Sequence, residues 1–167
     1  TFLMIISNAL DGFAFSVEAL CGEYLGRKNR ELFQKVIRLS TYWAVVAAVL
    51  LMLIFTAFGG LIIDLLTSVE SVRAQAKLYL PWLIAFPLLG IWFYMLDGIF
   101  IGTTSVKQMQ NTMIISVLGI FFPLWFITQG LGNHGLWLSM ALFFIARAVT
   151  LWWCYRRNLI KGVWFSD

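Results

Sequence analysis

The stretch LSTYWAVVAAVLLMLIFTAFGGLII, residues 39–63, contains no charged side chain and decides the fold of this chain. A longer run lies between Lys107 and Arg147, where 39 residues include a single ionisable group, His134. The hydrocarbon core of a bilayer is crossed by about 20 predominantly apolar residues in a helix. Runs of this length and composition therefore predict helices that cross a membrane.

The composition of the whole chain points the same way. Apolar residues make up 61% of the sequence and charged residues 12%, whereas a soluble domain carries about 25% charged residues. The net charge of +4 is small, and most basic residues flank apolar runs, so they indicate orientation in a membrane rather than contact with nucleic acid. Cys21 and Cys154 form no CxxC pair, so we expect neither a disulfide nor structural zinc. The expected partner is the lipid bilayer, with no nucleic acid.

We expect an all-α membrane protein with five transmembrane helices. Helices are favoured over barrel strands because strands of a membrane barrel alternate in polarity over about 10 residues, and no such alternation is present. Pro81, Pro87 and Pro123 lie in or at the edges of apolar segments, where we expect kinks. The expected spans are residues 1–22, 40–63, 78–101, 112–129 and 136–155.

The basic residues predict the orientation of the spans. Nine of them fall in three connecting regions on one face of the expected bundle, and the opposite face carries only Arg73 and Lys77. Because cytoplasmic loops are enriched in Lys and Arg, the first face is expected to be cytoplasmic, with the C-terminus inside and the chain entering from outside. The nine residues are Arg27, Lys28, Arg30, Lys35, Arg38, Lys107, Arg156, Arg157 and Lys161.

The start of the chain suggests that it belongs to a longer protein. Thr1 opens directly on an apolar segment, with no initiator Met and no signal peptide. An outside start without a targeting segment is hard to achieve, and five spans are an odd number for a self-contained bundle. We therefore expect Thr1 to be an internal residue.

Three stretches, in order and with matching spacing, resemble one transporter family. DGFAFSVEALCG at residues 11–22, followed by LGR at 25–27, resembles the eighth helix of multidrug and toxic compound extrusion (MATE) transporters, closest to the DinF branch. YLPW at 79–82 and LDGIFIGT at 96–103 resemble the tenth helix of that branch, and LGNHGLW at 131–137 resembles the turn entering the twelfth. The resemblance covers nearly the whole chain.

This resemblance implies twelve helices in two six-helix lobes, of which the chain would be helices eight to twelve, a partial C-terminal lobe over residues 1–167. It also implies alternating access driven by a gradient of H⁺ or Na⁺. The N-terminal lobe and the seventh helix are absent, including the first-helix acid thought to couple the cation in such transporters. That role is therefore transferred to no residue of this chain.

Four charged residues fall inside the expected spans: Asp11, Glu18, Asp97 and Arg147. A charge at the centre of a spanning helix costs about 2.5–3.5 kcal/mol on translocon scales, so each should be paired, protonated or hydrated. Asp11 and Glu18 are two turns apart and share a helix face with Phe15 between them. Arg147 can pair with either Glu18 or Asp97, and the sequence does not choose between the two pairings.

We take Asp11 and Glu18 as candidate cavity or ion-coupling residues, and Asp97 with Arg147 as a candidate intramembrane charge network. On the functional hypothesis Asp11 faces the central cavity and binds protons or cationic substrate. On the structural hypothesis Asp11 and Asp97 make hydrogen bonds across helices or to kinked backbone. Gly22 with Gly26, and Gly98 with Gly102, have the small-xxx-small spacing of closely packed helices.

The sequence therefore predicts part of a secondary active efflux transporter. It would exchange small organic substrates, including cationic or amphipathic compounds, against H⁺ or Na⁺ in the bacterial inner membrane. No cofactor, metal site or catalytic residue is expected, and no phosphate-binding loop, HExxH or GxSxG motif is present.

Three rival interpretations remain. A lipid-linked-intermediate flippase of the same superfamily would need a more cationic cavity, and here Arg147 is the one basic residue inside a span. A non-transporting gene remnant would insert into the membrane without alternating access. A membrane enzyme ranks last, because the chain has one His and no cluster of His, Asp or Cys at one face.

Overall fold

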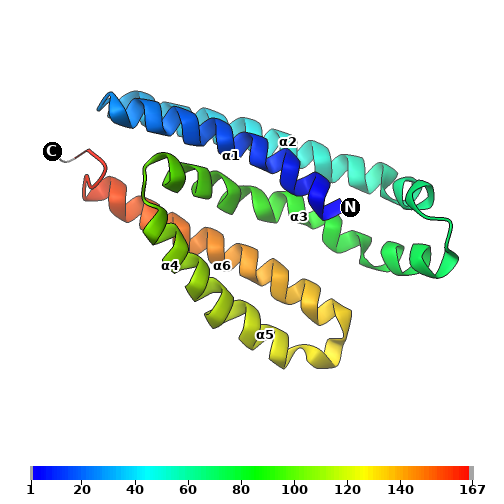
Figure 1. Cartoon of the computed structure of the whole chain (residues 1–167). Coiled ribbons are helices and arrows are strands. Elements are labelled where there is room, and N and C mark those ends of the chain that lie inside the picture. The colour runs from blue at the N-terminus through cyan, green and yellow to red at the C-terminus, as the bar shows by residue number, and fades with distance from the viewer. Residues whose placement is uncertain (1, 166–167) are drawn as a thin grey trace.

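The computed structural model describes residues 2–165, and all of its regular elements are helices, with no strand in that range. Thr1, where the first expected span begins, and residues 166–167 lie outside the described residues. In order along the chain (Figure 1), the elements are α1 (Phe2–Gly26), α2 (Arg30–Leu66), α3 (Glu70–Gly102), α4 (Val106–Ser116), a π-helical turn (Val117–Phe121), α5 (Phe122–Ile127), a 3₁₀ turn (Gln129–Leu131) and α6 (Asn133–Ile160).

Five helical segments are long and apolar enough to cross a bilayer, as the sequence predicts, with α4, the π turn and α5 together forming the fourth. Several of the helices are longer than the expected spans. α2 contains 37 residues, or about 55 Å at 1.5 Å per residue, against a hydrocarbon core of about 30 Å. The charged ends of the helices therefore continue the helical backbone beyond the apolar runs.

The connection between α1 and α2 is much shorter than the sequence suggests. Only residues 27–29 separate the two helices, so Lys35 and Arg38, expected in a connector, lie on α2 instead. Asn29 explains the early start, because its side chain accepts a hydrogen bond of 3.0 Å from the backbone N–H of Leu32. An Asn at this position satisfies one of the free N–H groups of a first helical turn.

The central helix is α3, which contacts α1, α2, α4 and α6. Figure 1 shows it between the α1–α2 pair and the pair formed by α4–α5 and α6. Gly98 and Gly102 permit its approach to α1, because a Cβ at either position would collide with backbone atoms of Ala14 or Glu18. Gly22 lies in the same contact, whereas Gly26 faces open space. Three of the four glycines in the predicted small-xxx-small pairs thus pack closely.

The three prolines are accommodated in two ways. Pro81 and Pro87 lie inside α3, which is one helix from Glu70 to Gly102. Pro123 lies in the first turn of α5, directly after the π-helical turn. There the N–H of Phe122 bonds to the carbonyl of Val117, five residues earlier. A π turn inserts an extra residue into the helix, so the ladder is already irregular where proline lacks its N–H.

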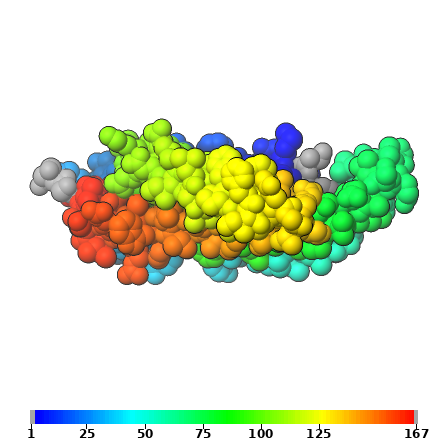
Figure 2. Space-filling model, turned by 90° about the horizontal axis from the view of Figure 1, so that it is seen from below, coloured from blue at the N-terminus to red at the C-terminus, as the bar shows by residue number. Residues whose placement is uncertain are grey.

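The outer surface is mostly apolar. Many large hydrophobic side chains are more than a third exposed, among them Leu65, Leu118, Ile127 and Trp153. A surface of this composition suits contact with acyl chains or with other membrane helices. Seen from below (Figure 2), α4–α5 and α6 cover one face of the molecule, and the end formed by α2 and α3 protrudes beyond it.

Candidate functional site

The strongest polar contact inside the bundle joins Asp97 of α3 to Arg147 of α6. Nη2 of Arg147 lies 2.7 Å from Oδ1 and 2.8 Å from Oδ2 of Asp97. The Arg147 side chain is 7% exposed and that of Asp97 21%. Of the two pairings that the sequence leaves open for Arg147, the structure contains the one with Asp97. Each charge removes the penalty that the other would incur in an apolar surrounding.

Two further side chains surround the guanidinium of Arg147. Its Nη1 donates to the sulfur of Met113 on α4 at 2.7 Å. Its carbon lies 5.7 Å from the centre of the Phe93 ring on α3, within the range of a cation–π contact. Arg147 therefore links α6 to both α3 and α4. No other basic residue within residues 2–165 is buried.

A second polar group lies where α1 meets α3. The hydroxyl of Ser7 is 2.8 Å from the hydroxyl of Tyr94 and donates to Oδ2 of Asp11 at 3.4 Å. Because the Ser7 proton goes to Asp11, the Tyr94 hydroxyl is the donor in the other bond. The three residues form a chain of hydrogen bonds that ends on a carboxylate. Within residues 2–165 Asp11 has no cationic partner.

This chain borders a cavity of about 220 Å³ between α1, α3 and α6. Ser7 and Tyr94 supply its polar wall, and the rest is apolar or aromatic. The remaining lining residues are Leu3, Ile6, Phe86, Gly90, Met140 and Phe144. Since Asp11 bonds to Ser7, its carboxylate adjoins a cavity large enough for several water molecules.

Glu18 lies apart from both groups. Its side chain is partly exposed and makes no ion pair within the described residues. Phe15, one turn before it, is 66% exposed. The stripe of Asp11, Phe15 and Glu18 therefore faces partly outward from these five helices, and Asp11 alone of the three is linked to the cavity through a neighbour.

Ser7 and Tyr94 are the residues that sequence reasoning missed. The available signal was their spacing from the acids, because Ser7 lies four residues before Asp11 and Tyr94 three residues before Asp97. Residues three or four apart share a helix face. That spacing alone does not show that Ser7 and Tyr94 lie close together. They do so because α1 and α3 pack closely, as they also do at Gly98.

His134 lies in the first turn of α6, at the opposite end of the bundle from the basic residues of α2. Its Nδ1 accepts a hydrogen bond of 3.2 Å from the indole of Trp82, and its ring lies 4.9 Å from that of Tyr79. No group of three or more His, Cys, Asp or Glu residues is arranged to hold a metal ion among the residues described.

The model of the MatE family matches residues 1–127. The chain is 36% identical over 167 residues, 99% of its length, to "DNA damage-inducible protein F" of Escherichia coli (strain K12). It spans 36% of the length of that relative. No solved structure matches significantly. Five apolar helices, a paired intramembrane charge and a family match over three quarters of the sequence agree with one another: this chain is an integral membrane protein and belongs to the MatE family.

Proposed function

We propose that this chain supplies helices eight to twelve, a large part of the C-terminal lobe, of a secondary active efflux transporter. The complete protein would lie in the bacterial inner membrane, with the C-terminus in the cytoplasm. It would exchange small organic compounds, including cationic or amphipathic ones, against H⁺ or Na⁺ by alternating access. The N-terminal lobe of the same protein is the partner that completes the central cavity.

The observation that carries this proposal is the environment of Asp11. The residue lies near the middle of the spanning helix α1, has no basic partner among residues 2–165, and bonds to Ser7 at the cavity wall. An unpaired carboxylate inside a membrane is costly unless it is protonated, binds a cation or is hydrated. A carboxylate that exchanges between protonated, cation-bound and hydrated states can respond to an ion gradient.

The two polar groups would have different tasks. Asp11 would take up a proton or Na⁺ in one conformation and release it in the other. The hydroxyls of Ser7 and Tyr94 would orient the carboxylate and supply oxygen atoms, the ligand type that hard cations prefer. The ion pair of Asp97 with Arg147 would hold α3 and α6 together while the lobe moves.

The rival flippase function has less support from the cavity lining and from the Asp97–Arg147 pair. A flippase for a pyrophosphate-linked lipid needs free cationic groups in the cavity. None of the residues lining the cavity is charged, and Arg147 is already paired with Asp97. We therefore favour export of organic substrates driven by a cation gradient.

The test measures efflux of a fluorescent cationic compound by the full-length protein in a host lacking its own exporters. Asp11→Asn should abolish efflux while membrane abundance, measured with an antibody against the tail, stays unchanged. Glu23→Gln is the matched control, since Glu23 pairs with Arg27 at the exposed end of α1. Equal loss of efflux and abundance in Asp11→Asn would mean that the residue is structural.

A second measurement tests the assignment to a lobe. The mass of the native protein, captured from membranes by its tail, should be nearly three times the 19.1 kDa of this chain. A mass near 19.1 kDa would contradict the two-lobe transporter and favour a chain that inserts without transporting.

A further inference from the structure

A long groove runs between α2 and α6 over the surface of α3, and we call it the α2–α6 groove. Its deep part is a cavity of about 280 Å³ lined by Trp92, Leu96, Ala148, Val149 and Trp152. A small recess beside it brings in Ile37, Thr41, Met95, Ile99 and Tyr155. A third section, of about 370 Å³, adds Gln34, Arg38, Arg156, Leu159 and Ile160. Trp152 lines all three sections, so they adjoin one another.

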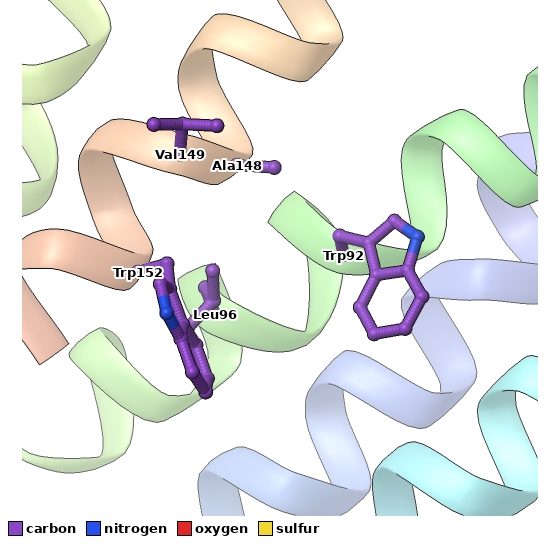
Figure 3. A pocket seen from close by; sticks show the side chains of 5 residues that line it. All are labelled: Trp92, Leu96, Ala148, Val149 and Trp152. Atoms are coloured by element: carbon purple, nitrogen blue, oxygen red, sulfur yellow. The ribbon is translucent and has the colours of Figure 1, made fainter. Parts of the chain in front are cut away.

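The deep part of the groove is entirely apolar. Figure 3 shows the indoles of Trp92 and Trp152 on either side of Leu96, with Ala148 and Val149 on the facing helix. Trp92 is 49% exposed and Trp152 52%, so both rings have a free face. Two exposed indoles beside a slot lined by aliphatic side chains offer the surface that an acyl chain contacts.

The other end of the groove is basic. Arg38 of α2 and Arg156 of α6 line it together, and both are exposed. Within residues 2–165 neither has an ion pair, a side-chain hydrogen bond or a cation–π contact. The other five arginines each make at least one such contact: Arg27 with Glu23, Arg30 with the Leu159 carbonyl, Arg73 with Asp64, Arg147 with Asp97 and Arg157 with Trp153. The groove thus holds the two arginines whose charge is not engaged.

The length of the groove matches one leaflet. From Arg156 to Ala148 there are eight residues of α6, or about 12 Å along the helix axis. Half of the hydrocarbon core of a bilayer measures about 15 Å. Since Arg156 stands at the basic end of α6, the apolar section extends from the headgroup level toward the bilayer centre.

The groove lies away from the cavity that adjoins Asp11. On α3 the cavity is lined by Gly90 and Tyr94, and the groove by Trp92 and Leu96. Successive residues of a helix are rotated by about 100°, so positions two apart point in nearly opposite directions. A molecule in the groove therefore does not occupy the proposed transport cavity.

We propose that the α2–α6 groove binds one anionic phospholipid. Its phosphate contacts Arg38 and Arg156, and one acyl chain lies against Trp152, Leu96 and Trp92. The charge at one end selects the anionic headgroup, because basic side chains near an anionic leaflet attract such lipids. The apolar section distinguishes a phospholipid from free phosphate, which would use the arginines alone.

The test measures lipid retention by the purified full-length protein in detergent, using native mass spectrometry. Phosphatidylglycerol and phosphatidylcholine with the same acyl chains are added in turn. The native protein should retain phosphatidylglycerol preferentially. Each arginine near the headgroup is worth about a fivefold change in affinity, so Arg38→Gln with Arg156→Gln should weaken phosphatidylglycerol binding about 25-fold. Phosphatidylcholine, whose headgroup has no net charge, should lose much less.

The matched control removes the same charge from the same end of α6. Arg157 and Lys161 line a different pocket, with Gln108 and Asn158 on the side of α4. Arg157→Gln with Lys161→Gln should therefore retain phosphatidylglycerol like the native protein. Trp152→Ala should weaken the binding of phosphatidylglycerol as well, and Trp153→Ala, at the neighbouring exposed position, should not.

Three results would overturn the proposal. Equal retention of the two lipids by the native protein would leave a groove without headgroup selectivity. An equal loss in the Arg157/Lys161 variant would mean general attraction by the basic end. Displacement of the bound phosphatidylglycerol by inorganic phosphate at equal concentration would mean that the site takes a free anion.

Recovery of binding in Arg38→Lys with Arg156→Lys would show that the Gln variant had lost charge rather than its fold.

Discussion

Asp97 and Arg147 are fifty positions apart in the chain, yet a single guanidinium nitrogen of Arg147 donates to both carboxylate oxygens of Asp97, at 2.7 and 2.8 Å. The pair is the main polar link between α3 and α6. Because both side chains are largely buried, neither can lose its partner without leaving an unpaired charge in an apolar environment.

Arg147→Met should destabilise the protein strongly, by about 3–5 kcal/mol, since it leaves Asp97 buried and unpaired. The double variant Arg147→Met with Asp97→Leu should recover most of that loss, because no charge then remains. Thermal unfolding in detergent measures both. Arg27→Gln is the control, as it breaks the exposed pair with Glu23 and should change little. A double variant no more stable than the single one would mean that the pair contributes through packing.

Ser7→Ala and Tyr94→Phe should each reduce efflux by the full-length protein, but less than Asp11→Asn. Tyr94→Phe removes one hydrogen bond from the chain that ends on Asp11 and Ser7→Ala removes both, each worth about 1 kcal/mol, while the carboxylate itself remains. Initial efflux rates at equal membrane abundance provide the measurement. Ser16→Ala is suitable as a control, because the Ser16 hydroxyl bonds only to the carbonyl of Gly12 in its own helix. Unchanged rates in both variants would mean that these hydroxyls play no part in efflux.

Gly98→Ala should lower the stability of the bundle by about 1–3 kcal/mol, because overpacking forces α1 and α3 apart. The added Cβ meets the carbonyl of Ala14 and the side chain of Val17. Gly12→Ala serves as the matched control: a Cβ there has open space, and alanine favours a helix by about 0.5–1 kcal/mol over glycine. The thermal midpoints of the two variants should therefore move in opposite directions. A stable Gly98→Ala protein would contradict the close approach.

The orientation of the chain is tested by labelling single cysteines in intact cells. In a background with Cys21→Ala and Cys154→Ser, Lys161→Cys should react with an impermeant maleimide only after permeabilisation. Gly130→Cys, in the turn between α5 and α6 at the other end, should react in intact cells. This follows from the nine basic residues on one face and the two on the other. The reverse labelling pattern would place the C-terminus outside.

The number and type of the helices follow from the sequence, because a long apolar run without charge has few alternatives in a bilayer. The close approach at Gly98 and Gly102 was also visible as a spacing. The ends of the helices were not, since α2 begins at Arg30, where Asn29 caps it, rather than near residue 40 as hydropathy suggests. The partner of Arg147 and the link from Asp11 to Tyr94 depend on how α1, α3 and α6 rotate against one another. Side-chain packing sets that rotation, and no local pattern encodes it.

The length of α2 has a practical consequence for imaging this protein. Its 37 residues exceed the hydrocarbon thickness by about 25 Å, mostly before the apolar run that begins at Leu39. The opposite end of α2 is braced against α3 by Lys77 and Arg73, both in contact with Asp64. Figure 1 shows this α2–α3 end beyond the α5–α6 turn. Small membrane proteins are difficult to align in electron microscopy because little rigid mass stands outside the micelle. A fiducial domain joined at Ser68, in the short α2–α3 connection, would sit on a braced helical pair and report the orientation of the whole bundle.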